Sequence, residues 1–151
     1  MAALAACSSI DCPVENTVRT VYQVIDDDGA EISCADTVYV WSQRFDGQDT
    51  LLLNRAVGAS QYSLPISSQR PADTLVWLVA DTQHQFTLDT VVVEKEDLPH
   101  FESVDCATSF FHRIHRISTS HHGIDTIIIN RSFVDYDSQT PHFYIRFKAR
   151  H

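Results

Sequence analysis

Short runs in which apolar and polar side chains alternate recur along the whole chain. In residues 17–25, Tyr22 and Val24 share one face of an extended segment, while Arg19 and Gln23 fall on the other. A period of two residues is typical of β-strands, because successive side chains point to opposite sides of a sheet. Further runs rich in strand-forming residues cover residues 37–41, 50–53, 61–66, 74–80, 82–88, 90–94, 101–104, 110–118, 124–130 and 142–148.

Turn residues separate these runs. The pairs Asp28-Gly29, Asp46-Gly47 and His122-Gly123 each lie between two runs and predict hairpin turns. No segment has a convincing helical period, although a short helical turn fits at residues 96–100 or around Asn16. We therefore predict an all-β fold, an antiparallel β-sandwich of about 9–11 short strands, with a closed or partly open β-barrel as the alternative.

The composition agrees with this fold and limits the function. Val, Ile, Thr and the aromatic residues make up 52 of the 151 residues, whereas Lys, Glu and Met together number eight. The length predicts a single domain, which we place at residues 12–151, after an N-terminal tether at residues 1–11. The net charge of −9, with only two Lys and nine Arg, argues against nucleic acid as a partner.

The N-terminal residues indicate export. Leu4-Ala5-Ala6-Cys7 resembles a bacterial lipobox, in which the cysteine is acylated, and the polar Ser8-Ser9 that follows suits a tether. The basic region and most of the apolar region of a signal peptide are not present before it, so an Ala-rich cytosolic start is the alternative. Lipidation of Cys7 would place the domain at the outer membrane.

If Cys7 carries a lipid, three cysteines remain, which fits one disulfide and one thiol in an oxidising compartment. Cys12 and Cys106 both lie at irregular strand edges, and we favour a bridge between them. Cys34 has the surroundings of a small buried residue. A zinc site is the weaker reading, because the chain has no CxxC pair and no Cys/His cluster with ligand spacing.

The dipeptide Asp-Thr occurs six times, at positions 36, 49, 73, 81, 89 and 125, where the composition predicts about one occurrence. A structural interpretation is that Asp ends a turn by accepting a backbone N–H two residues on, and Thr opens a strand. A calcium site is a second interpretation. In a third, the triplet resembles the O-glycosylation acceptor of the Bacteroidetes, which is matched at Thr37, Thr50, Thr74, Thr90 and Thr126.

Other candidate chemistry is sparse. His112 and His115 are three residues apart in a predicted strand and so face opposite sides, which favours exposed histidines over a metal site. The chain has no nucleophile elbow or phosphate-binding loop, and the pairs Glu94/Glu96 and Asp135/Asp137 lie at strand ends. We assign no catalytic residue, cofactor or metal ligand. In residues 100–112 we expect a disulfide-bearing strand with two inward aromatic residues rather than a functional patch.

Several segments together resemble an uncharacterised family of small lipoproteins from the Bacteroidetes. They are Asp11-Cys12-Pro13, Leu64-Pro65-Ile66, residues 100–106, Phe110-Phe111-His112, Val134-Asp135-Tyr136 and His142-Phe143. The resemblance implies export and a lipid anchor but no activity. We expect a cell-envelope module that binds a protein or glycan partner or has a structural role, and touches the membrane only through its lipid. The alternatives are a carbohydrate-active or other hydrolase with Asp/Glu in a cleft, and a calcium-stabilised module.

Overall fold

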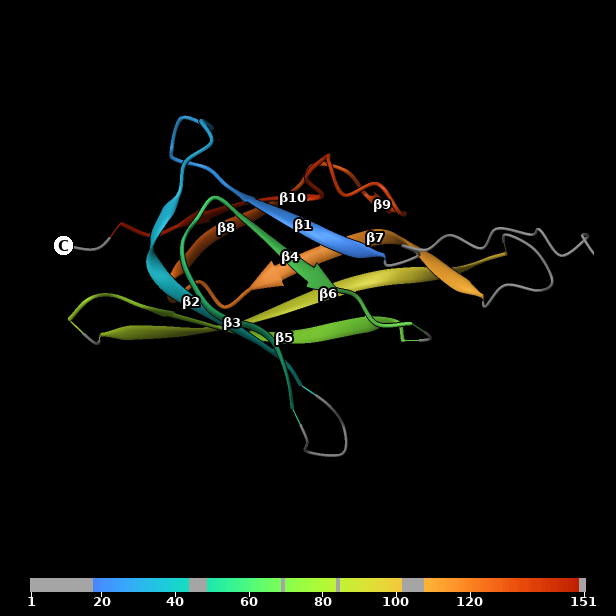
Figure 1. Cartoon of the computed structure of the whole chain (residues 1–151), viewed down its shortest axis with the longest axis horizontal. Helices are drawn as coiled ribbons and strands as arrows, with labels where there is room; N and C mark the ends of the chain where they lie inside the picture. Colours follow the sequence, from blue (N-terminus) through green and yellow to red (C-terminus); the bar gives the residue numbers. More distant parts are fainter. Residues whose placement is uncertain (1–17, 44–48, 69, 84, 102–107, 150–151) are drawn as a thin grey trace, which may run out of the picture.

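A computed structural model of the chain describes residues 18–43, 49–68, 70–83, 85–101 and 108–149. These residues form two β-sheets, shown in Figure 1. The smaller sheet has the order β4 (Gln61–Pro65), β1 (Arg19–Val24), β10 (Phe143–Phe147), β8 (Ile124–Ile129). The larger sheet has the order β3 (Thr50–Ala59), β2 (Cys34–Ser42), β5 (Ala72–Ala80), β6 (Phe86–His100), β7 (Ser109–Thr119), β9 (Phe133–Val134). The predicted all-β class is confirmed.

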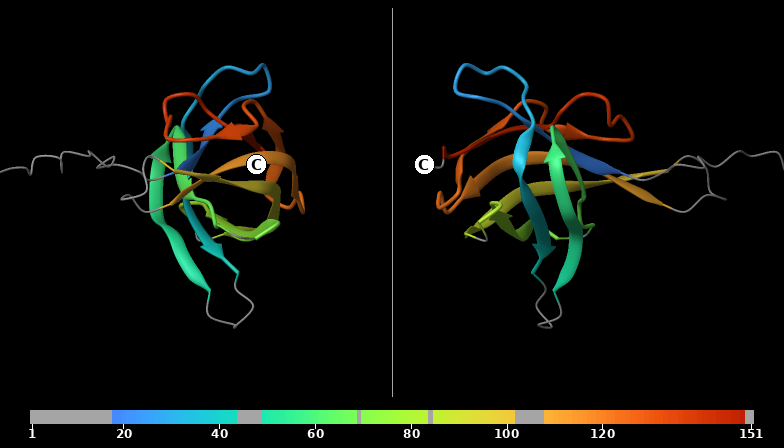
Figure 2. Two further views of the ribbon diagram at one scale, coloured as in Figure 1. Left: turned by 90° about the vertical axis from the view of Figure 1, so that its right-hand side faces the viewer. Right: turned by 60° about the vertical axis from the view of Figure 1, so that its left-hand side comes forward.

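The larger sheet curls around one side of the smaller one (Figure 2). The chain crosses from the larger sheet to the smaller one at Ser60, which separates β3 from β4. It crosses in the same direction through residues 120–123, between β7 and β8. The architecture is therefore a β-sandwich with the character of a partly open barrel. Within the described residues, no helix is long and apolar enough to cross a membrane.

One strand pair departs from the predicted antiparallel arrangement. β1 pairs with β4 in antiparallel fashion but with β10 in parallel, with Tyr22 opposite Phe143. Because β1 has a neighbour on each side and side chains above and below, all five residues from Thr20 to Val24 are buried. The parallel pair joins strands from opposite ends of the described chain and closes the sandwich.

Aromatic side chains fill the space between the two sheets. Trp77 of β5 is fully buried, and its ring centroid lies 5.2 Å from that of Tyr22 and 5.5 Å from that of Tyr62, both edge-on. Leu75 and Val79 alternate with half-buried neighbours on the same strand, as the period of two requires. This core holds the sheets together and leaves the polar groups described below at its margins.

Strand β6 differs most from the prediction. It runs through residues 86–100, where the sequence pattern indicated two shorter runs and a helical turn at 96–100. The alternation of apolar and polar residues in the sequence is interrupted, because Asp89, Lys95 and Asp97 occupy inward positions in place of apolar residues. Pro99 is tolerated since β5 pairs with β6 only as far as Glu94, so among the described strands none pairs with this side of the end of β6.

Two of the three predicted hairpins are corners between the sheets. The turn at Asp28-Gly29 exists, with Gly29 at φ 86°, but its flanking strands β1 and β2 belong to different sheets. His122-Gly123 likewise lies between β7 and β8 of different sheets. Asp46-Gly47 lies outside the described residues, between β2 and β3, which do pair in antiparallel fashion. The turn residues indicated chain reversal but not which sheet the chain enters next.

Candidate functional site

Three polar side chains meet at the margin of the core. On β6, Val91 and Val93 point inward, and the same alternation brings Lys95 and Asp97 inward as well. The antiparallel register places His112 of β7 directly opposite Asp97. Residues directly opposite in a sheet share one face. The cluster therefore follows from the same period of two that builds the core.

Asp97 is the centre of this cluster. One carboxylate oxygen, Oδ1, accepts hydrogen bonds from Lys95 Nζ and His112 Nδ1, each at 2.7 Å. The other, Oδ2, accepts the backbone N–H of Arg70 at 2.9 Å. The side chains of Lys95, Asp97 and His112 are 0%, 11% and 1% exposed, and Lys95 Nζ also donates to the carbonyl of Arg70 at 2.7 Å. Removal of charges from water is costly, so close partners are needed to keep them here.

The protonation states follow from these contacts. Burial by itself would raise the pKa of Asp97, but hydrogen bonds from Lys95, His112 and the Arg70 backbone lower it below its usual value. Burial lowers the pKa of His112 and outweighs the opposing effect of Asp97. At neutral pH, Asp97 is ionised and His112 is neutral, with its ring proton on Nδ1. Nε2 is then the ring nitrogen that can accept a hydrogen bond.

His112 borders a small pocket at the end of the sandwich where β1 and β7 begin. The pocket has a volume of about 260 Å³. The described residues around it are His112, Ser68, Thr108, Ser109, Phe110, Val18 and Ile66. Three of them carry hydroxyl groups, and none is acidic or basic apart from the neutral imidazole. The Asp97–His112 pair thus lies behind a polar pocket.

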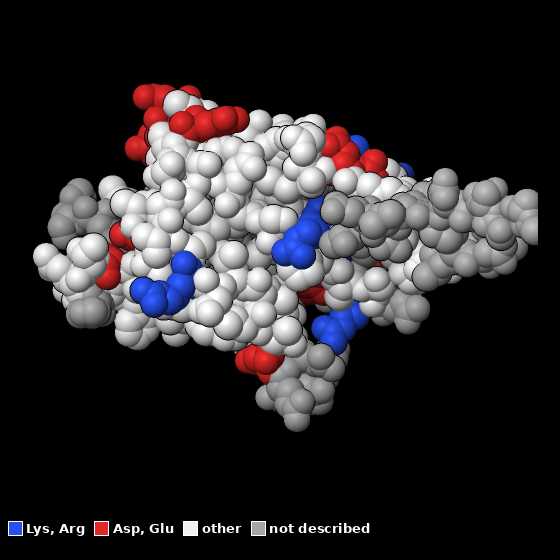
Figure 3. Space-filling model, in the orientation of Figure 1, with Lys and Arg blue, Asp and Glu red and all other residues white. Residues whose placement is uncertain are grey.

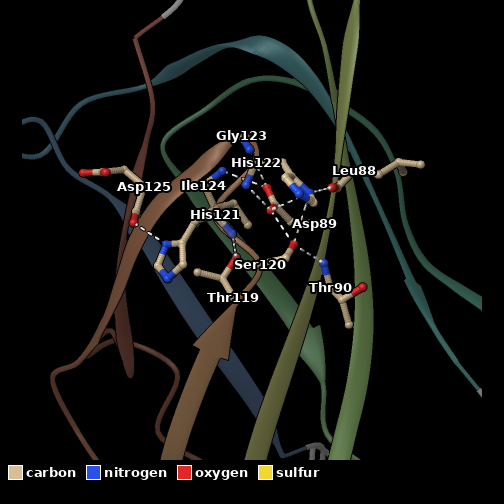
Figure 4. Close-up of polar contacts among 10 residues, drawn as sticks. All are labelled: Leu88, Asp89, Thr90, Thr119, Ser120, His121, His122, Gly123, Ile124 and Asp125. Carbon is tan, nitrogen blue, oxygen red and sulfur yellow. Dashed lines mark hydrogen bonds and ion pairs between the residues drawn. The ribbon is translucent and has the colours of Figure 1, made fainter.

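A second buried carboxylate, that of Asp89, belongs to the Asp-Thr repeat. Its oxygens accept the backbone N–H groups of His122, Gly123 and Ile124 at 2.6, 2.7 and 2.8 Å, and the hydroxyl of Ser120 at 2.7 Å (Figure 4). Burial would raise the pKa of Asp89, but these hydrogen bonds together lower it. The carboxylate is saturated by the protein itself and ties the β7–β8 corner to β6, so we assign it a structural role.

The other Asp-Thr pairs have varied partners. Asp81 accepts the N–H of Gln83, two residues on, at 2.9 Å, which confirms the predicted turn geometry at this position. Asp73 is buried inside β5 and accepts the N–H and hydroxyl of Ser67. Asp125, inside β8, accepts a hydrogen bond from Arg146 at 2.7 Å. The prediction that each Asp ends a turn is wrong for Asp36, Asp73, Asp89 and Asp125, which lie within strands.

The structure contains no cluster of three or more His, Cys, Asp or Glu side chains suited to a metal ion, as far as the described residues extend. The charged side chains on the face shown in Figure 3 are few, and acidic groups gather on the loop between β1 and β2. That loop contains Asp26, whose carboxylate accepts the N–H groups of Asp28 and Ala30 within its own turn.

The expectation of exposed histidines is wrong at two positions. His112 and His142 are 1% and 0% exposed. His142 precedes β10, and its Nδ1 accepts the backbone N–H of Val21 at 3.0 Å. Burial, with a smaller effect of Arg131, lowers the pKa of His142 to about 4. His115 is exposed on the opposite face of β7 from His112, as predicted.

The expectation of two inward aromatic residues in the same region holds for one of them. Phe110 borders the pocket between the sheets. Phe111 points to the outer face, where its ring stacks on His100 at 4.2 Å and meets Tyr136 edge-on at 5.0 Å. Alternation at the start of β7 places the two neighbouring rings on opposite faces of the strand.

Several predicted site residues lie outside the described residues, namely Cys7, Cys12 and Cys106. Cys34 is buried, as the sequence indicated. The five candidate acceptor threonines all lie in strands. Thr50 and Thr90 are exposed, and Thr37, Thr74 and Thr126 are half-buried.

Sequence reasoning missed the Lys95–Asp97–His112 cluster. A signal is present in the sequence, because Lys95 and Asp97 continue the inward row of Val91 and Val93, whereas the candidate pair Glu94 and Glu96 points outward. The partner strand was harder to find. The register slips between Glu94 and Lys95, where β7 contains an extra residue, so sequence alone does not align Asp97 with His112.

Comparison with known proteins gives the chain a family. No curated protein and no solved structure matches it. A family model matches residues 37–147, which include all described strands from Thr37 of β2 to β10 and the whole Lys95–Asp97–His112 cluster. The chain therefore belongs to the family described as "Family of unknown function (DUF6452)".

Proposed function

We propose that this protein is an exported module of the cell envelope, anchored by a lipid on Cys7, that binds a partner and does not catalyse a reaction. The lipobox-like Leu4-Ala5-Ala6-Cys7 and the resemblance to envelope lipoproteins support the location. The outer membrane is the proposed site, with the domain facing the periplasm or the cell surface.

The observation that carries the binding role is the state of the buried carboxylates. Asp89 accepts four hydrogen bonds and Asp97 three, all from the protein's own groups. A glycosidase needs two carboxyl groups that face a substrate across a cleft. Glu96 and Asp97 border one shallow hollow, but they alternate to opposite faces of β6, and Glu96 lies 3.4 Å from Arg113. This arrangement supports a scaffold with a recognition surface over the alternative hydrolase.

The anchor is tested in a native host. The protein would be expressed from its natural gene in cells that are fed an alkyne fatty acid. The cells would then be fractionated, and the protein purified from each fraction and its alkyne group labelled. We expect label and membrane association for the natural sequence, loss of both in Cys7→Ser, and no change in the matched control Ser9→Ala. An unlabelled protein in the soluble cytosolic fraction would contradict the proposal.

O-glycosylation is a further part of this proposal, and burial ranks the candidate sites. An enzyme that modifies a folded, exported protein must reach both residues of the Asp-Thr pair. Asp49 and Thr50 are both exposed, whereas Asp89 beside the exposed Thr90 is buried. Mass spectrometry of native protein is expected to find a glycan on Thr50 before any other candidate. Peptides with an unmodified Thr50 would contradict this ranking.

A further inference from the structure

The pocket beside His112 has the chemistry of a ligand site. It is bordered by His112, whose Nδ1 is bound to Asp97 at 2.7 Å, and Asp97 is in turn held by Lys95 and the Arg70 backbone. This chain fixes the plane of the ring and keeps the proton on Nδ1, as a carboxylate partner does for histidines in functional sites. Nε2 is thereby left as a preorganised acceptor beside a pocket.

A buried Lys–Asp–His cluster is a costly way to fill a core margin. Well-packed apolar residues of similar volume often give equal or greater stability than a buried charged group and its partners. The neighbouring inward positions, Val91 and Val93, show that this sheet accommodates aliphatic side chains in the same row. Structures with perturbed pKa values beside a pocket are candidates for functional sites. A ligand-binding role for His112 in the pocket would explain why the chain buries the charged groups of Lys95 and Asp97 despite their desolvation cost.

The groups around the pocket define the ligand. Ser68 and Thr108 contribute hydroxyls, whereas the hydroxyl of Ser109 lies on the outer face of β7, where its Oγ accepts a hydrogen bond from Tyr136 at 2.9 Å. None of the described residues that border the pocket is charged, so none of them offers a counter-charge to a phosphate or a carboxylate. A neutral ligand that both donates to Nε2 and accepts from hydroxyls fits these partners.

The size and the remaining walls narrow the class further. A volume of about 260 Å³ is at or below the lower end of the range for small-molecule sites, enough for a single ring. Phe110 also borders the pocket. We propose that this pocket binds one unit of a neutral sugar, with His112 Nε2 accepting a hydroxyl proton and the serine and threonine hydroxyls donating to the sugar oxygens. The ligand class rests on the proposal that the domain binds rather than catalyses.

Saturation-transfer NMR on the full chain tests this assignment. The probes are neutral monosaccharides (glucose, galactose, mannose and N-acetylglucosamine), with glucuronate and inorganic phosphate as charged comparators. We expect transfer to at least one neutral sugar at millimolar concentration and none to the charged compounds. His112→Asn keeps a donor to Asp97 but removes Nε2, and we expect it to weaken binding by about tenfold or more. The matched control His115→Asn, on the outer face, should leave binding unchanged.

A second variant guards against misfolding of the first. Ser68 and Thr108 are exposed, so the double variant Ser68→Ala/Thr108→Val should fold and should also weaken the sugar signal. Absence of transfer from any neutral sugar to the folded natural protein would overturn the proposal, as would binding that survives the double variant unchanged or binding of the charged compounds alone. These outcomes are independent of fatty-acid labelling, so a failed sugar site leaves the proposed anchor standing.

Discussion

At the scale of single residues, the molecule uses buried polar groups as internal connectors. Asp89 holds the N–H groups of one corner, and His142 holds the N–H of Val21. The two buried histidines have opposite tautomers, because Nδ1 of His112 donates to Asp97 whereas Nδ1 of His142 accepts from a backbone N–H. Only His112 keeps a nitrogen beside a pocket, since Nε2 of His142 is buried without a partner.

The variant Asp89→Asn is expected to reduce the free energy of unfolding by about 2–4 kcal/mol, because an amide –NH₂ would face N–H groups that now donate to a carboxylate. Chemical denaturation at neutral pH measures this loss. The matched control Asp27→Asn changes a side chain that is 95% exposed and should have little effect. Folding lowers the pKa of Asp89. The difference in the free energy of unfolding between the natural protein and Asp89→Asn should therefore disappear as pH falls through the folded pKa. Equal stabilities at neutral pH would contradict the role of Asp89.

Protonation of His142 lowers the free energy of unfolding in mildly acidic solution. Its pKa falls from 6.5 to about 4 on folding, so the unfolded chain takes up a proton before the folded one does. Stability from this group is complete above the unfolded pKa and is lost as pH falls toward the folded pKa, by as much as about 3 kcal/mol. His142→Asn keeps an acceptor for Val21 N–H but cannot titrate. We expect a flatter profile of unfolding free energy against pH in this range, and an unchanged slope would contradict the assignment.

At the scale of elements, alternation predicted strands well where only apolar residues face the core. β5 was found nearly at its full length, because Leu75, Trp77 and Val79 mark its inner face. β6 was divided, because Asp89, Lys95 and Asp97 occupy inner positions and resemble turn residues in sequence. A polar residue satisfied by a distant partner cannot be told from a turn residue by its neighbours in the chain. The same limitation concealed the candidate site, which needs the register between β6 and β7.

The β7–β8 corner depends on a close approach at Gly123. A Cβ at this position would lie 2.8 Å from Cβ of Thr87 on β6, and Gly123 does not have a positive φ, so the constraint is contact and not backbone conformation. Gly123→Ala should cost about 1–3 kcal/mol through overpacking. If contact is the cause, Thr87→Gly should recover part of that loss in the double variant. Purely additive effects in thermal unfolding would contradict this explanation.

At the scale of the whole molecule, a sandwich could be predicted from composition and strand spacing, but the chain path could not. Glycine turns mark where the chain reverses, and both Asp28-Gly29 and His122-Gly123 turn it into the other sheet. The parallel pairing of β1 with β10 is likewise a property of the assembled sandwich and has no local signal.

The predicted bridge between Cys12 and Cys106 would staple the start of the domain to its middle. Both residues lie outside the described part of the chain, so the bridge stays a prediction. Cys12→Ser and Cys106→Ser should each cost about 2–5 kcal/mol. Reductant should lower the melting temperature of the natural protein and not that of either variant. Cys7→Ser serves as the control, and equal melting temperatures with and without reductant would rule out the bridge.

The central claim is that the Lys95–Asp97 pair fixes His112 as a neutral acceptor beside the pocket. A long-range proton–nitrogen NMR spectrum of nitrogen-labelled protein reads this directly, because it distinguishes protonated from bare ring nitrogens. At neutral pH we predict a proton on Nδ1 and a bare Nε2 for His112, and the reverse tautomer for His142 as an internal reference. A doubly protonated His112, or one with its proton on Nε2, would contradict the account.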